Sequence, residues 1–396
     1  MIRRVVIKPG REKPLRQRHP WVFSGAIQKI DGDIKDGDVA DIVSADGEFL
    51  ARGYINRKSQ IVVRVLTWDV REAIDETFWL SRIERAIKAR SRDDNACRLI
   101  NAESDGLPGL IVDRYDGWLV MQVLTFGMEK VKRELVRMLV GVMEVKGIYE
   151  RSDVEVRAKE GLEEVTGVLY GEEPPDEIEI TECGLADRPV RFLVDVKRGQ
   201  KTGFYLDQRE NRPKAAAYCK NTEVLNAFSY TGGFTVHALV GDACRVVNID
   251  SSEEALALAR KNLVLNGFEI REDDFIQEDV FSALRRYRRE GQTFDVVILD
   301  PPKFAPSVTQ VERATRAYKD LDLVAMQIIR PGGTLVSFSC SGLVSPDLFQ
   351  KIVFSASLDA GRDAQIIEKL SQSRDHPILL SFPEAEYLKG LVCRVW

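Results

Sequence analysis

The fold is decided by residues 224–234, which read VLNAFSYTGGF. The first four residues form a largely apolar run of strand length, and Gly232 and Gly233 make a turn before a helical pattern begins at Phe234. Glycines in such a turn allow the backbone to approach a ligand closely. A strand that leads through a Gly-rich turn into a helix is typical of an α/β domain with a ligand site at the strand end.

The same rhythm continues to the end of the chain. Helical patterns separate the first five strands of this region, which predicts a series of β-α-β units with helices on both faces of a sheet. The predicted strands are 224–227, 244–250, 274–277, 294–299, 334–338, 365–370 and 391–396, and the predicted helices are 234–240, 253–266, 280–290 and 311–329.

Ligand-type residues follow four successive strands. The glycine turn follows the first strand, Asp250 closes the second, Asp279 comes after the third, and the stretch DPPK at 300–303 comes after the fourth. In open parallel sheets ligands bind at the carboxyl ends of the strands, and an acid about 20 residues beyond the turn suits a ribose diol. This order of strand-end residues is the pattern of the S-adenosylmethionine-dependent methyltransferase sheet. A dinucleotide dehydrogenase is less compatible with it, because such enzymes rarely have Asp-Pro-Pro at the fourth strand.

Cys340 ends the fifth strand within the stretch FSCSG at 338–342. A buried core thiol is the usual fate of a cysteine. At this strand end, however, a thiolate is placed to attack C6 of a pyrimidine, after which C5 accepts a methyl group from a sulfonium and a base removes the C5 proton. Asp300 is the candidate to hydrogen-bond or protonate the N3 edge of the ring as negative charge develops.

The N-terminal half has a different composition. Short strand patterns at 3–8, 39–44, 49–53 and 61–66 predict a small β-rich domain, and a helix is predicted over 75–92. Residues 98–182 predict a separate α+β unit. The six cysteines form no CxxC pair, which argues against a zinc site. Because the N-terminal stretch has no signal-peptide pattern, we expect reduced thiols inside a cell, most of them buried.

The charge is segregated along the chain, although its net value is only -5. Residues 1–30 hold eight bases and one acid (+7), residues 185–220 nine bases and four acids (+5), and residues 144–182 four bases and thirteen acids (-9). This predicts a basic face for a polyanion with the acidic excess elsewhere; the alternative is a solvated terminal cluster. We interpret Trp21 and Phe23, which lie among the N-terminal bases, as core residues rather than stacking rings.

The chain closely resembles the large-subunit ribosomal RNA cytosine-5 methyltransferases that carry an N-terminal PUA domain. The resemblance covers nearly the whole length and is carried by GREK at 10–13, HPWVFSGA at 19–26, ESDGLPG at 103–109, RSDV at 151–154, KTGFYLDQR at 201–209, FSYTGGF at 228–234, DPPKF at 300–304, FSCSG at 338–342 and YLKG at 387–390.

The resemblance implies three domains: a PUA domain at 1–72, a central α+β domain at 73–188, and a class I, Rossmann-like, seven-stranded catalytic domain at 189–396. It implies 5-methylation of one cytosine in 23S rRNA, with S-adenosylmethionine as cofactor, S-adenosylhomocysteine as product, and no metal. The sequence has no apolar run of about 18 residues and no signal-peptide pattern in its first residues, so we expect a cytoplasmic protein. A homodimer stays open.

The resemblance also assigns site residues. Cys340 and Asp300 are the catalytic pair. The expected cofactor contacts are Tyr205, Asp207, Gln208, Arg209, Asn226, Phe228, Ser229, Tyr230, Thr231, Gly232, Asp250, Ser251, Asp279, Asp300 and Pro301. The expected RNA contacts are Arg11, Lys13, Arg16, Arg18, His19, Lys201 and Lys303.

Two positions depart from the pattern of related enzymes. Asn226 stands where many methyltransferases have an acid, and Tyr230 stands where they have the first glycine. The methionine end of the cofactor is therefore expected to share a backbone carbonyl and Asp300. A related group has a second cysteine in the fourth-strand stretch, whereas this chain has Pro302-Lys303, so the base that removes the C5 proton is not identified.

Two other functions stay open at this point. Asp-Pro-Pro also serves methylation of exocyclic amines, where an aromatic residue usually follows directly; here Lys303 precedes Phe304. The other alternative is a non-catalytic RNA-binding factor, which the intact series of strand ends argues against.

Overall fold

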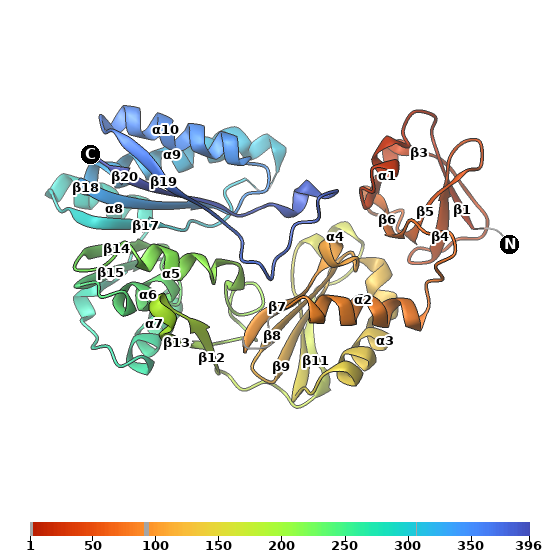
Figure 1. Cartoon of the computed structure of the whole chain (residues 1–396), viewed down its shortest axis with the longest axis horizontal. Coiled ribbons are helices and arrows are strands. Elements are labelled where there is room, and N and C mark those ends of the chain that lie inside the picture. Colours follow the sequence, from red (N-terminus) through yellow and green to blue (C-terminus); the bar gives the residue numbers. More distant parts are fainter. Residues whose placement is uncertain (1–2, 91–94, 306) are drawn as a thin grey trace. The chain divides into compact units, whose positions relative to one another are not determined.

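The computed structural model describes residues 3–90, 95–305 and 307–396. The chain divides into two compact units, which are taken one at a time (Figure 1). The first consists of residues up to Ile178 with Val194–Phe204 and Asp375–Ala385, and the second of Glu179–Leu193, Tyr205–Arg374 and Glu386–Trp396. Among the described residues, no helix has both the length and the apolar character needed to cross a membrane.

The first unit begins with a six-stranded sheet in the order β2-β6-β5-β4-β1-β3. The four strands predicted from the sequence are present, while β2 and β3 were not predicted, because β2 has only three residues and β3 has no fully buried side chain. The elements are β1 (Arg4–Ile7), α1 (Lys13–Arg16), β2 (Trp21–Phe23), β3 (Ile27–Asp31), β4 (Val39–Val43), β5 (Phe49–Ile55) and β6 (Ile61–Thr67).

A five-stranded sheet, β11-β10-β9-β8-β7, completes the first unit together with two long helices. Asp75 caps the first of these helices by accepting a hydrogen bond from the backbone N–H of Phe78, which explains where it begins. Residues 91–92 of the helix predicted here lie outside the described residues. The elements are α2 (Glu76–Lys88), β7 (Ala96–Asn101), β8 (Leu110–Tyr115), β9 (Trp118–Val123), α3 (Phe126–Val142), β10 (Gly147–Ser152), α4 (Val156–Lys159) and β11 (Val165–Gly171).

The second unit is built on a seven-stranded sheet in the order β16-β15-β14-β17-β18-β20-β19, and a two-stranded hairpin precedes it. The hairpin strands are β12 (Ile178–Cys183) and β13 (Pro189–Val194). The sheet strands are β14 (Glu223–Ala227), β15 (Arg245–Asp250), β16 (Phe275–Gln277), β17 (Phe294–Leu299), β18 (Ile329–Ser339), β19 (Ala364–Ser371) and β20 (Lys389–Val395). The helices are α5 (Asn211–Ala216), α6 (Gly233–Val240), α7 (Glu253–Leu265), α8 (Val280–Glu290), α9 (Val311–Ile328) and α10 (Pro346–Ala360).

Helices cover both faces of this sheet, as the alternating pattern predicts. One face packs on α8, α9 and α10 through a core that includes Leu284, Tyr318 and Phe349. The other face packs on α5 and α6 through Phe234 and its neighbours. Figure 1 shows α9 and α10 on one side of the strands and α5, α6 and α7 on the other. The Rossmann-like architecture is therefore present, with β14 at the point where the strand order reverses.

The elements that the sequence pattern missed have physical causes. The helix α10 was not predicted, because Phe354 and Leu358 are exposed and blur its apolar face. The strand β18 starts at Ile329 rather than 334, because the chain turns extended directly at the end of α9. The hairpin β12-β13 spans the predicted boundary at 188/189, and the three-domain division stays a prediction.

The expectation that most cysteines are buried was wrong in part. Only Cys97, Cys219 and Cys393 are buried, whereas Cys183 and Cys244 are exposed. Among the acids of residues 144–182, three glutamates are buried ion-pair partners. These are Glu150 with Lys132, Glu160 with Arg64, and Glu182 with Arg212.

Asp322 of α9 gives a prediction for stability. It is fully buried, and neither carboxylate oxygen has a close hydrogen-bond partner among the described residues. Burial raises its pKa from 3.8 to about 7, against a smaller lowering by Ser337. The folded state therefore keeps this proton to higher pH than the unfolded chain. The contribution of this protonated group to stability is complete below about pH 4, and on the order of 4 kcal/mol of it is lost as pH rises to about 7.

Asp322→Asn removes this dependence, and we expect it to raise stability at pH 8 by about 1–2 kcal/mol, because the buried amide retains part of the cost. Thermal unfolding from pH 4 to 8 measures the effect. Asp320→Asn, at an exposed residue of the same helix, is the control and should leave the pH profile unchanged. An Asp322→Asn profile parallel to that of the wild type would contradict the assignment.

Candidate active site

The carboxyl ends of the central strands meet at one edge of the seven-stranded sheet. Ala227, the last residue of β14, pairs with Ile249 of β15 on one side and with Leu299 of β17 on the other. The next strand, β18, pairs in turn with β17 and ends at Ser339. The glycine turn, Asp250, Asp300 and Cys340 therefore emerge at the same edge, as predicted.

The turn after β14 has an unusual backbone. Phe228, Tyr230 and Gly232 have φ values of 62°, 46° and 78°, which only glycine adopts without strain. Backbone hydrogen bonds hold this conformation: Ser229 N–H donates to the Ile249 carbonyl at 3.0 Å, and Tyr230 N–H donates to Asp250 Oδ2 at 2.8 Å. Strain of this kind collects at ligand sites, where the rest of the fold enforces it.

The acids after β15 and β16 are placed differently from each other. Both oxygens of Asp250 accept one backbone N–H, from Tyr230 and from Ser252, so each keeps a lone pair for a ligand hydroxyl. Asp279 is exposed and caps α8 by accepting from the N–H and hydroxyl of Ser282. The cap accounts for Asp279 structurally, and its cofactor contact stays a prediction.

Four buried polar atoms test whether these residues fit a polar ligand. Asn226 Oδ1, Ser229 Oγ, Thr231 Oγ1 and Gln208 Nε2 have no hydrogen-bond partner among the described residues. A buried polar atom without a partner costs about 1–3 kcal/mol, so four of them indicate a missing partner. One of these atoms is an amide oxygen, on Asn226, and two are hydroxyl oxygens, on Ser229 and Thr231, and all three lie at the end of β14 or in the turn after it. Such atoms can hydrogen-bond the ammonium, carboxylate and ribose groups of S-adenosylmethionine. The residues present therefore fit this cofactor.

The segment 205–209 lies against the same edge. The ring of Tyr205 meets that of Tyr230 edge-on at 5.3 Å. Burial raises the pKa of Tyr205, and Asp300, Tyr230, Asp207 and Cys340 raise it further, in that order. Tyr205 therefore lies near both candidate catalytic residues, Asp300 and Cys340.

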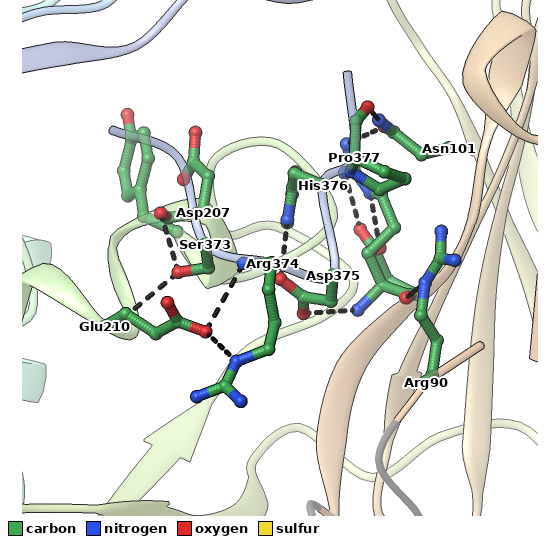
Figure 2. Close-up of polar contacts among 12 residues, drawn as sticks. Arg90, Asn101, Asp207, Glu210, Ser373, Arg374, Asp375, His376 and Pro377 are labelled. Atoms are coloured by element: carbon green, nitrogen blue, oxygen red, sulfur yellow. Dashed lines mark hydrogen bonds and ion pairs between the residues drawn. The ribbon is translucent and has the colours of Figure 1, made fainter. Parts of the chain in front are cut away.

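Residues from the end of the chain hold the segment 205–209 in place. Tyr387 donates its hydroxyl to Asp207 Oδ2 at 2.7 Å, and Ser373 donates its N–H and its hydroxyl to the Asp207 carbonyl. Figure 2 shows Ser373 between Asp207 and Glu210. Tyr387 and Ser373 are supporting residues that sequence reasoning missed. The stretch YLKG at 387–390 was the available signal.

Cys340 lies at the expected strand end and is neither walled into the core nor fully exposed. Its thiol donates to the carbonyl of Pro301 at 3.7 Å, so it stands beside the Asp-Pro-Pro stretch. Asp300 is half-buried, and its N–H approaches the Ala227 carbonyl at 3.5 Å. Three strand ends, those of β14, β17 and β18, are thereby brought together around one thiol.

A buried cluster of Glu182, Arg212 and His237 supports this edge of the sheet, and no sequence motif predicts it. Glu182 of β12 accepts from Arg212 at 2.6 Å and from His237 at 3.1 Å. Arg212 in turn donates to the Tyr205 carbonyl at 2.7 Å. Burial lowers the pKa of His237, so this residue is a neutral packing residue stacked on Phe192.

The candidate RNA contacts are placed as follows. Arg11, Lys13, Arg16 and Arg18 are exposed around α1, whereas His19 is partly buried and its Nε2 lies 3.2 Å from Glu384. Lys201 and Lys303 are exposed. The structure gathers the first five in one segment of the first unit.

The core interpretation of the two N-terminal rings was wrong for Phe23. Its side chain is 48% exposed. Trp21 is partly buried, because its ring packs on Phe382 and its indole N–H donates to Glu103 at 2.7 Å.

Known proteins share both halves of this architecture. Residues 5–68 match the PUA-like domain family, and residues 163–392 match the S-adenosylmethionine-dependent methyltransferase family. Proteins named ribosomal RNA large subunit methyltransferase I are 50% identical over 396 residues in Aliivibrio fischeri (99% of both chains) and 46% identical over 397 residues in Klebsiella pneumoniae (99% of this chain, 98% of the other).

A solved SAM-dependent methyltransferase from Streptococcus mutans has a TM-score of 0.84 at 22% identity, covering 100% of both chains. A further methyltransferase, solved with SAH, has a TM-score of 0.86 at 22% identity with the same coverage. The predicted fold class is confirmed.

Proposed function

Because the chain belongs to the S-adenosylmethionine-dependent methyltransferase family that includes the ribosomal RNA large subunit methyltransferases I, we propose that it methylates C5 of a cytosine in 23S rRNA through a covalent bond from Cys340 to C6. The family model matches more than half of the chain, and the named relatives match nearly all of it. The choice of base, ring position and nucleophile is the proposal.

The observation that carries the proposal is the place of Cys340. Among the six cysteines, it alone combines partial exposure with a position at the carboxyl end of a central strand. Its sulfur faces the Pro301 carbonyl and influences Tyr205, which itself stands beside Asp300. A nucleophilic cysteine must be accessible to its substrate, and the partly exposed thiol of Cys340 meets this requirement at the edge of the sheet where the cofactor is expected.

The cofactor would be held by the end of β14 and by the acid after β15. Asn226 Oδ1 and the hydroxyls of Ser229 and Thr231 have unused hydrogen-bonding capacity, and Asp250 retains lone pairs for ribose hydroxyls. When bound, S-adenosylmethionine supplies an electrophilic methyl group on a sulfonium. Asn226 offers an acceptor for the ammonium where an acid is usual, which answers the departure noted from the sequence.

The protein's residues would act on the pyrimidine in a fixed order. The Cys340 thiolate gives its electron pair to C6, the C5–C6 double-bond pair moves into the C4–C5 bond, and the C4–N3 double-bond pair moves onto N3. In its protonated form, Asp300 donates a hydrogen bond to the N3 edge as negative charge grows there. After C5 has accepted the methyl group, a base takes the C5 proton, its bonding pair restores the double bond, and Cys340 leaves as a thiolate.

The exocyclic-amine alternative is disfavoured by Phe304. That chemistry needs an aromatic ring after Asp-Pro-Pro that is free to stack on the base. The ring of Phe304 instead packs against Tyr318 at 4.8 Å and Phe281 at 6.1 Å, on the hydrophobic core.

Nucleoside analysis tests the proposed function. We expect 23S rRNA from cells lacking the protein, incubated with the purified chain and cofactor, to gain 5-methylcytidine at one position by mass spectrometry and bisulfite mapping. N4-methylcytidine would establish the amine reaction instead, and no new methyl group would contradict rRNA as the substrate.

The basic segment predicts a salt effect on RNA binding. Phosphate binding releases counterions, so replacing Arg11, Lys13, Arg16 and Arg18 by Gln should flatten the plot of log affinity against log salt by about 0.7 for each phosphate that is no longer bound. Filter binding at several salt concentrations measures the slope. Gln at Arg316 and Lys351, exposed bases of α9 and α10, is the control. An unchanged slope in the quadruple variant would remove this segment from the RNA interface.

A further inference from the structure

A buried lysine lies beside the candidate nucleophile. Lys389 is the first residue of β20, and its backbone pairs with Ser339, the residue before Cys340. Only 5% of Lys389 is exposed. Lys389 belongs to the stretch YLKG, to which the proposed reaction assigns no role. Burying an ammonium is costly, so its partners indicate what it does.

Lys389 fastens the turn that follows Cys340. Its Nζ donates to the carbonyls of Ser341 at 2.8 Å and Val344 at 2.6 Å. The N–H of Val344 closes the same turn by donating to the Ser341 carbonyl at 3.0 Å. Both partners are neutral, and no carboxylate in the described part of the chain lies within ion-pair distance of Lys389. Its positive charge is therefore not cancelled locally.

The charge of Lys389 and the state of Cys340 are coupled. Burial lowers the pKa of Lys389 to about 8, and Cys340, followed by Glu386, acts in the opposite direction. Tyr205 and Tyr318 also act with Cys340, and burial raises the pKa values of both, so both are neutral at pH 7. Asp300 acts on Tyr205 from the opposite strand end. Of these groups, Lys389 is the one that carries positive charge.

We propose that Lys389 is a positioning residue that stabilises the Cys340 thiolate with its ammonium group and fixes the turn behind it. The thiol proton passes to water, and the electron pair left on Sγ is the one that bonds to C6. This inference rests on the proposed role of Cys340 and adds the residue that keeps it reactive.

Thiol alkylation tests the proposal without any methyl transfer. In the full chain with Cys183→Ser and Cys244→Ser, the rate of iodoacetamide labelling at Cys340 is followed against pH by peptide mass spectrometry. Cys219 and Cys393 should react slowly, because burial raises their pKa values to about 12. A neighbouring opposite charge shifts a pKa by about one unit or more. Lys389→Met should therefore move the labelling midpoint up by about one pH unit and slow labelling at pH 7 about tenfold.

Two more variants separate charge from position. Lys389→Arg keeps the charge and should restore the wild-type midpoint, whereas Lys389→Gln keeps an N–H donor without the charge and should shift it like Met. If Lys389→Met does not fold, the comparison of Lys389→Arg with Lys389→Gln tests the effect of the charge on the labelling midpoint. Lys369→Met on the neighbouring strand β19, where the side chain is exposed and bonded to Gln350, is the matched control and should change nothing.

A midpoint that stays at the wild-type value in the foldable neutral variants would overturn the role of Lys389. That result is distinct from failure of the proposed function, in which wild-type protein forms no covalent bond with a pyrimidine whatever the labelling midpoint is.

Discussion

Cys340→Ala should abolish methyl transfer, with a loss of about three orders of magnitude or more, while S-adenosylmethionine still binds. Removal of a covalent nucleophile has effects of this size, because the remaining groups cannot supply the missing bond. The polar atoms that would hold the cofactor belong to β14 and to the turn after it, so the substitution leaves them intact. Transfer of a labelled methyl group to 23S rRNA measures the first effect, and calorimetry with the cofactor measures the second.

The exposed cysteines provide the control for this substitution. Cys183 ends the hairpin strand β12, and Cys244 precedes β15 at the end of that strand opposite to Asp250, so Cys183→Ala and Cys244→Ala should both keep wild-type transfer. Turnover of Cys340→Ala within a few fold of the wild type would exclude covalent catalysis by this residue.

Glu182→Gln should destabilise the protein by about 3–5 kcal/mol. The glutamate has no exposed surface on its side chain, and it is the partner of both Arg212 and His237. Burial alone would raise its pKa, but Arg212 and His237 outweigh burial and hold the pKa below its usual value, so the residue is charged at neutral pH. The substitution leaves the Arg212 guanidinium buried without its counter-charge, which is the costly way to break a buried pair.

The same strand offers a matched control. Glu179 of β12 pairs with Arg191 at 3.5 Å, and both side chains are about half exposed. Glu179→Gln should therefore change stability by less than about 0.5 kcal/mol. Denaturant unfolding compares the two variants. A loss below about 1 kcal/mol for Glu182→Gln would show that the cluster does not hold the hairpin and Tyr205 in place.

The sequence predicts the framework of the second unit because its strands and helices repeat with the right periods. The strand Phe294–Leu299 and the helix Val280–Glu290 have the predicted bounds, since each has a clean apolar pattern and clear end signals. The strand ends then follow from topology, which places Asp250, Asp300 and Cys340 at one edge before any coordinates are known.

Pairings between distant side chains could not be predicted in this way. Glu182 is 30 residues from Arg212 and 55 from His237, and no local period links them. Lys389 and Tyr387 belonged to a recognised stretch, yet only the fold reveals that one contacts the turn after Cys340 and the other Asp207. Composition counts Glu182 only as one of the thirteen acids of residues 144–182 and does not indicate that it is buried.

Trapping with RNA that carries 5-fluorocytidine tests the account most directly. Fluorine at C5 cannot leave as a proton does, so a nucleophile that has added to C6 stays attached after methyl transfer. The account predicts a stable protein–RNA adduct that needs S-adenosylmethionine and maps by mass spectrometry to Cys340. Methylation of unmodified RNA by the same protein without any adduct at Cys340 would contradict it.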